Sequence, residues 1–188
     1  LPELIEVLHR PLGEIVDIDE KSLAMFGQWP WPRTTVRDLL LALTSKGAAV
    51  VAFDVLFAEP DRTSVDEIVK QLPAEAASAI TAAMAGRPSN DELFAATLQD
   101  TPSVLSVALG EEASTTLQAK AGFAFAGDDP RPFLLPFNGV TQNLPELEQA
   151  ARGIGAFNWV ADRDQVVRRV ALMFRLDQSF VPSLAAEA

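Results

Sequence analysis

Two short apolar runs on either side of one helical pattern, all within residues 14–61, constrain the fold more than any other part of the chain. The first run, residues 15–19, is rich in β-branched side chains and predicts a strand. A capping-box pattern at Thr35 begins the predicted helix, and Gly47 ends it. The second run, residues 48–53, is almost entirely apolar, as in a strand that is covered on both faces. The sequence therefore predicts a right-handed βαβ unit with two parallel strands.

The chain beyond this unit continues to alternate between helices and strands. Residues 103–109 predict a third strand, which a second crossover returns to the sheet. Residues 154–160 and 166–174 are apolar runs around a polar turn, and they predict an antiparallel hairpin. Further helices are expected in residues 64–72, 74–85, 89–98, from 143 and from 180, and further short strands in residues 123–126 and 133–137. We expect an α/β fold in a single domain over residues 1–188, with a central sheet, a parallel βαβ core, an antiparallel C-terminal hairpin and helices packed on the sheet.

Charge and composition exclude several classes of function. The formal net charge is −11, which repels phosphate backbones and argues against nucleic acid as a partner. The chain has no cysteine, so disulfides, zinc–thiolate sites and thiol catalysis are excluded. The longest apolar run, residues 47–58, is too short to cross a bilayer, which needs about 20 residues.

Three aspartates follow the two predicted strands of the βαβ unit. Asp17 and Asp19 are two apart and would share one face of the first strand, and Asp54 closes the second strand. Ligands of open α/β sheets bind beyond the carboxyl ends of the strands, where these carboxylates would meet. We expect a pocket for a polar or cationic ligand there, and a metal, if one binds, would be held by these three residues. The alternative is that each aspartate caps the turn that follows it.

An aromatic and proline segment, WPWPR, lies between the two apolar runs. Its prolines force extended backbone at the preceding residues, which fixes the directions of Trp29 and Trp31. The two indoles form either a rigid platform for a ligand or partner, or a lid that packs on the core. Arg33 stands at the helix start, where the helix dipole disfavours a cation, so we expect a carboxylate partner such as Asp19 or Asp54.

A phosphatase is the enzymatic alternative. Haloacid-dehalogenase-type enzymes begin with a strand and an Asp-x-Asp, which Asp17 and Asp19 would supply, and residues 127–129 are similar to their late acidic motif. The residues after Asp19 depart from that family, and the late motif lies in a proline-rich loop. The only histidine, His9, lies in a polar terminal segment, which argues against histidine-based catalysis.

Several motifs occur in order along most of the chain: IVDIDEKSL (15–23), GQWPWPR (27–33), LLLALTSKGAAVVAFDVLFAEPD (39–61), GAFNWVADRDQVVRRVAL (155–172) and SLAAEA (183–188). Together, and in this order, they resemble one family, the type-two CHASE domain, a sensory extracellular domain associated with cyclases and histidine kinases. Gln165 departs from the glycine that this family would place in the turn before residues 166–168.

The resemblance implies a non-enzymatic module on the periplasmic or extracellular face of the bacterial cytoplasmic membrane. It also implies flanking membrane helices and a cytoplasmic output module, such as a nucleotide cyclase or a histidine kinase, in the full-length protein. The signal is an unknown small molecule or protein, no cofactor is expected, and a ligand-free dimerisation module is a further alternative. Arg168 is expected to pair with an acidic residue across the hairpin. The candidate ligand-binding or polar-network residues are Asp17, Asp19, Trp29, Trp31, Arg33, Asp54, Asn158 and Arg168.

Overall fold

The computed structural model describes residues 13–111 and 117–188. The chain divides into two units, residues 1–31 and residues 32–188. The described part of the first unit holds one helix, α2 (Glu20–Phe26), and the second unit holds the strands and the remaining helices.

The predicted strand at residues 15–19 is wrong. Residues 13–19 have no regular secondary structure, and Ile15 is 97% exposed, so its β-branched side chain is not packed in a sheet. The physical reason lies at Asp19, whose carboxylate accepts hydrogen bonds from the Ser22 backbone N–H (2.8 Å) and hydroxyl (2.7 Å). Asp19 is therefore the N-cap of α2, and a helix begins where the sequence suggested the end of a strand.

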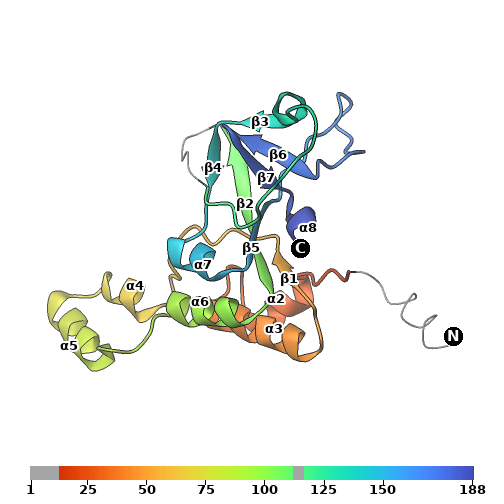
Figure 1. The fold of residues 1–188 in the computed structure, drawn as a ribbon. Coiled ribbons are helices and arrows are strands. Elements are labelled where there is room, and N and C mark those ends of the chain that lie inside the picture. Colours follow the sequence, from red (N-terminus) through yellow and green to blue (C-terminus); the bar gives the residue numbers. More distant parts are fainter. Residues whose placement is uncertain (1–12, 112–116) are drawn as a thin grey trace. The chain divides into compact units, whose positions relative to one another are not determined.

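The central sheet of the second unit is built around its longest strand, β2 (Ser103–Gly110), seen in green at the centre of Figure 1. Strand β1 (Val51–Phe53) pairs with it in parallel on one side, and β5 (Gly153–Ala156) pairs in parallel on the other. Strand β4 (Gly139–Thr141) pairs antiparallel with the last residues of β2. The crossover that returns β2 to lie beside β1 confirms a parallel βαβ core and the predicted second crossover. The predicted βαβ unit within residues 14–61 is wrong, because its first strand does not form.

A second, smaller sheet contains β3 (Leu135–Phe137), β6 (Met173–Leu176) and β7 (Ser179–Pro182). Strands β3 and β6 are parallel, and a 3-10 turn, η1 (Arg131–Phe133), precedes β3. Strands β6 and β7 form an antiparallel hairpin. The two sheets share one hydrophobic core, made of Val107, Leu109, Val140, Ile154, Ala156, Phe174, Leu176 and Val181.

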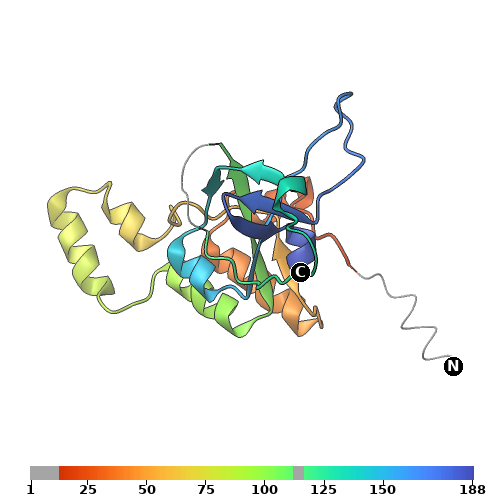
Figure 2. The ribbon, with the colours of Figure 1, turned by 45° about the horizontal axis from the view of Figure 1, so that its top comes forward.

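The helices of the second unit pack as a group of three, a pair and a single helix on the sheet. Helix α6 (Asn90–Asp100) lies between α3 (Arg33–Ser45) and α7 (Pro145–Ala150), and these three run side by side in Figures 1 and 2. Helices α4 (Val65–Val69) and α5 (Ala74–Met84) pack on each other, and α8 (Leu184–Glu187) packs on β5. In the described part of the chain, we find no helix that combines the length and the apolar character needed to cross a membrane.

The α/β class, the parallel core and the C-terminal antiparallel hairpin are confirmed, but the hairpin uses other residues. Strand β5 pairs with β2, and residues 157–172 form no strand, so the hairpin predicted between 154–160 and 166–174 is wrong. The tip of that segment is still a turn, because the Asp162 N–H donates to the Val166 carbonyl (3.0 Å). Gln165, which replaces the expected glycine there, has φ = 63°, a backbone region that favours glycine.

Several boundaries also differ from the prediction. Helix α3 begins at Arg33, two residues before the expected capping box, and Gly47 follows its end with φ = 93°. Residues 123–126 form no strand, and the helix expected from residue 180 is preceded by β7. Helices α5, α6 and α7 lie where the sequence predicts them, and Ser89 and Glu92 form the capping box of α6.

Glycine is required in β5 because α8 lies directly against this strand. A Cβ on Gly155 would lie 2.7 Å from the Leu184 Cα and 2.8 Å from the Ser183 carbonyl oxygen, and these are backbone atoms that cannot rotate away. A Cβ on Gly153 would meet the Glu187 side chain at 2.7 Å. The two glycines therefore set how closely α8 approaches the sheet.

We predict that Gly155→Ala lowers the free energy of unfolding by about 1–3 kcal/mol, because the added methyl group overpacks the contact with α8. Urea denaturation of the purified chain measures this loss. Gly122→Ala is the matched control, since its Cβ would meet nothing within 4 Å, and its stability should stay within about 0.5 kcal/mol of wild type. Equal stabilities of the two variants would contradict the close packing of α8.

Candidate functional site

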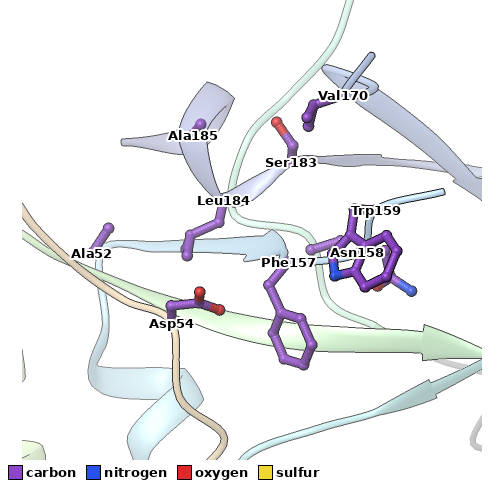
Figure 3. Close-up of a pocket in the computed structure, with 10 residues that line it drawn as sticks. Ala52, Asp54, Phe157, Asn158, Trp159, Val170, Ser183, Leu184 and Ala185 are labelled. Atoms are coloured by element: carbon purple, nitrogen blue, oxygen red, sulfur yellow. The ribbon is translucent and has the colours of Figure 1, made fainter. Parts of the chain in front are cut away.

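A shallow cavity of 370 Å³, largely open to solvent, lies in the second unit between the sheet and α8 (Figure 3). Two of its walls come from the carboxyl ends of the parallel strands β1 and β5, and the third comes from the start of α8. Its volume is in the range of small-molecule sites. The lining residues are Ala52, Asp54, Ala156, Phe157, Asn158, Trp159, Val170, Ser183, Leu184 and Ala185.

Strand alternation places β1 at the cavity. Phe53 points to one face of the sheet, where its ring meets the rings of Phe57 and Phe94 at 5.8 and 5.9 Å. Ala52 and Asp54 therefore point to the opposite face, and both line the cavity. The prediction that β1 is covered on both faces is wrong, because Ala52 is exposed to this open space.

The neutral polar side chains of the cavity wall are already hydrogen-bonded. The Asn158 amide oxygen accepts from the Leu109 N–H, and its amide nitrogen donates to the Leu109 carbonyl, both at 2.7 Å. The Ser183 hydroxyl oxygen accepts from the Ala186 N–H and caps α8. Asp54 has neither a hydrogen bond nor an ion pair with any residue that the structure describes, so it is the free charged group of this wall.

A second polar cluster is buried at the start of α3. The Arg33 guanidinium donates from Nε to Asp91 Oδ1 (3.0 Å) and from Nη2 to the Glu59 carbonyl (2.8 Å), and its Cζ lies 4.6 Å from the centre of the Phe57 ring. The Arg33 N–H donates to Asp61 Oδ2 (2.8 Å), and the Asp61 N–H donates to Asp91 Oδ2 (2.8 Å). Arg33, Asp61 and Asp91 are each no more than 6% exposed. The expectation that Arg33 pairs with Asp19 or Asp54 is wrong, since its carboxylate partner is Asp91.

The pKa values of the two carboxylates of this cluster are shifted in opposite directions. Burial raises the pKa of Asp61, but hydrogen bonds from the N–H groups of Arg33 and Thr63 and from the Asn90 amide outweigh it, so the pKa of Asp61 lies below its ordinary 3.8. Burial dominates at Asp91 and raises its pKa, against the opposing effects of the Asp61 N–H and the Arg33 charge. Asp61 also caps α3, because its carboxylate accepts the first N–H of the helix.

Sequence reasoning missed Asp61 and Asp91. Asp61 ends the EPD motif, but nothing in its neighbourhood indicates a cap for a helix that begins 28 residues earlier. Asp91 lies in the first turn of α6, where an acidic residue is expected from the helix dipole alone. The available signal was Arg33 itself, a cation at a helix start that needs a carboxylate partner.

The tryptophans of the first unit form an aromatic cluster. The Trp31 ring lies edge-on to those of Phe26 and Trp29, at 5.4 and 5.8 Å between centroids, and its Nε1 donates to the Gly27 carbonyl (2.7 Å). The Trp29–Pro30 peptide bond is cis. Trp31 is buried and Trp29 is half-buried, and the choice between platform and lid for these two indoles stays a prediction.

The two predicted aspartates of the first unit do not end a strand. Asp19 caps α2, as the turn-capping alternative expects, and its pKa is lowered by the hydrogen bonds from Ser22. Asp17 lies in the segment without regular structure. Both belong to the first unit and Asp54 to the second, so their convergence stays a prediction.

Arg168 pairs with acidic residues as expected, but within a turn. It donates to Asp164 (2.9 and 2.7 Å) and to Asp162 (3.4 Å), and Asp162 also pairs with Arg169. The side chains of both arginines are more than half exposed, so these pairs add little stability. These ion pairs lie at the turn between Trp159 and Val170, and both of those residues line the cavity.

The phosphatase alternative loses its structural basis. Asp17 and Asp19 do not follow a strand, and in residues 127–129 the Asp129 carboxylate pairs with Arg131 (2.9 Å). Within residues 13–111 and 117–188, no group of three or more potential metal-ligating side chains is found. His9 lies outside the described residues.

Comparison with known families gives one match. A family model described as the CHASE2 domain matches residues 9–188, which is nearly the whole chain. No curated protein and no solved structure matches the chain.

We predict that Arg33→Met destabilises the chain by about 3–5 kcal/mol, because it leaves Asp91 buried without its cation. Arg37→Met, four residues along the same helix, removes the exposed pair with Asp38 and should cost less than about 1 kcal/mol. Urea denaturation at neutral pH compares the two variants. Similar losses would show that the buried pair adds nothing beyond a surface pair.

We further predict that Asp61→Asn flattens the loss of stability in acid. The pKa of folded Asp61 lies below 3.8, so its contribution is fully present above the unfolded pKa and is lost as the pH falls through the folded pKa. Unfolding free energies measured between about pH 5 and about pH 3 should therefore fall more steeply for wild type than for Asp61→Asn. Asp100→Asn, an exposed control, should follow wild type; parallel curves for all three proteins would refute the assignment.

Proposed function

The chain belongs to the CHASE2 family of extracellular sensory domains, and on that premise we propose that it is the ligand-sensing domain of a bacterial transmembrane receptor. The family match over residues 9–188 is the observation that carries this proposal, and it confirms the resemblance seen in the sequence. The domain stands on the periplasmic or extracellular face of the cytoplasmic membrane. Membrane helices flank it in the full-length protein and connect it to a nucleotide cyclase or a histidine kinase in the cytoplasm.

The cavity is the sensory site in this proposal. A CHASE2 domain is sensory and non-catalytic, so a small molecule in the cavity acts as a signal and not as a substrate. Asp54 and Asn158, two of the residues that the sequence singles out, line this cavity. We assign Asp54 to ligand binding and Asn158 to holding the wall in place, because the amide of Asn158 is already hydrogen-bonded to Leu109.

Signal transfer begins at α8. The cavity is bounded on one side by the sheet, which the shared core of the two sheets holds in place, and on the other by Ser183, Leu184 and Ala185 at the start of α8. A ligand that fits one position of α8 better than another shifts the population between them. The shift passes to the membrane helix that follows in the receptor, and its size is limited by the difference in affinity for the two positions.

Cysteine labelling in cells tests the location of the domain. The chain has no cysteine, so Ser78→Cys, at an exposed position of α5, introduces a single thiol in residues 1–188 of the full-length receptor with any other cysteines removed. We expect a membrane-impermeant maleimide to label it in intact cells whose outer membrane has been permeabilised. Ser103→Cys is the matched control, because this position is fully buried and should react only after denaturation.

Labelling of Ser78→Cys only after cell lysis would place the domain in the cytoplasm and refute the proposal. The full reading frame supplies the second check. It should encode membrane-spanning helices on both sides of residues 1–188 and a cytoplasmic cyclase or histidine kinase. A reading frame that encodes neither would also refute the proposal.

A further inference from the structure

The cavity wall combines one unpaired negative charge with an apolar surface. Asp54 is the charged residue of the lining, and no lysine or arginine contributes to it. The apolar part comes from Ala52, Ala156, Phe157, Trp159, Val170, Leu184 and Ala185. From this wall we infer that the cavity binds an organic cation with an apolar body, an amine or a quaternary ammonium compound; this inference rests on the sensory role proposed above.

The carboxylate selects the charge of the ligand. Asp54 follows β1 directly, and its carboxylate points into the cavity in Figure 3. A ligand that covers this group removes it from water, which costs free energy unless the ligand brings an opposite charge. An ammonium group offsets that cost, while an anion adds repulsion to it. The net charge of −11 acts in the same direction, because the field of the whole chain attracts cations.

Trp159 supplies the aromatic surface that organic cations prefer. Its indole lies at the cavity mouth and is 64% exposed (Figure 3), an unusual state for a tryptophan that packing alone would bury. The face of an indole attracts ammonium groups more strongly than other aromatic rings do. Trp159 and Asp54 both line the cavity, with Phe157 between them in the view of Figure 3, so the ring and the carboxylate border the same space.

The remaining wall selects an apolar body over a bare inorganic ion. The neutral polar groups that line it, Asn158 and Ser183, already accept or donate hydrogen bonds within the chain. A metal ion would find a single carboxylate here, and hard cations require several oxygen ligands. Apolar groups of a ligand, in contrast, would bury the surfaces of Leu184, Ala185 and Val170, which is favourable. A small charged group alone would leave these surfaces in contact with water.

Isothermal titration calorimetry of the 188-residue chain tests the inference with matched probes. The cations are 2-phenylethylamine, which donates hydrogen bonds, and benzyltrimethylammonium, which does not. The neutral probe is 2-phenylethanol, the anion is 3-phenylpropionate, and methylammonium is a cation without an apolar body. We expect the two phenyl cations to bind at least about tenfold more tightly than any of the other three, as a charge-assisted contact implies.

Three variants assign the binding to these residues. Asp54→Asn should weaken the binding of both phenyl cations about tenfold or more. Trp159→Leu should weaken it about 2- to 30-fold, the range of a cation–π contact. Asp100→Asn, an exposed aspartate of α6 outside the cavity, should leave binding unchanged. Thermal unfolding of each variant separates loss of binding from loss of folding.

Each contrary result has a distinct meaning. Tighter binding of the alcohol or the anion, or full affinity in Asp54→Asn, would overturn the cationic class while the sensory role stays intact. Binding of none of the five probes would overturn the inference for the cavity as a whole. Neither result bears on the labelling of Ser78→Cys, which alone decides whether the domain faces outward.

Discussion

The buried ion pair of Arg33 and Asp91 is the interaction on which the helical side of the second unit depends. It joins the first residue of α3 to the first turn of α6, and Asp61 links both to the loop that leaves β1. Three segments that are far apart in the sequence thus meet at one charged cluster, and its side chains are almost fully buried. A buried pair of this kind contributes less to stability than to specificity, because few other arrangements of the three segments satisfy all of its hydrogen bonds.

The same loop connects the charged cluster to the cavity. Between Asp54 and Asp61 several hydrogen bonds hold the chain; among them, the Ser106 hydroxyl donates to the Val55 carbonyl, and the Phe57 N–H donates to the Asn143 amide oxygen. Phe57 also packs under the Arg33 guanidinium. Two side chains, Ser106 of β2 and Asn143 just before α7, therefore hold the segment that follows the carboxyl end of β1. They also fix the position of Asp54, which begins this segment. This side of the cavity is therefore fixed by hydrogen bonds from other parts of the second unit.

Much of the fold followed from local patterns, and the failures have a common physical cause. The run at 103–109 and the capping box at Ser89 were read correctly because their signals are complete within a few residues. Residues 15–19 and 157–172 have strand-like composition but find no sheet partner, which no local pattern reveals. The cavity was predictable only in part: Asp54 and Asn158 were singled out, whereas Trp159 and α8 depend on how β5 packs against β2.

The side chain of Asn158 also continues the hydrogen bonding of β2 beyond the end of β5. A strand edge with free N–H and C=O groups invites pairing with another chain. Where β5 ends, the Asn158 amide takes both the N–H and the C=O of Leu109, just as the peptide groups of a neighbouring strand would. Beyond the end of β5, the backbone groups of Leu109, itself only 5% exposed, are thus satisfied by a single side chain. A sensory domain can in this way leave a cavity open beside its sheet while the backbone groups of the neighbouring strand are already hydrogen-bonded.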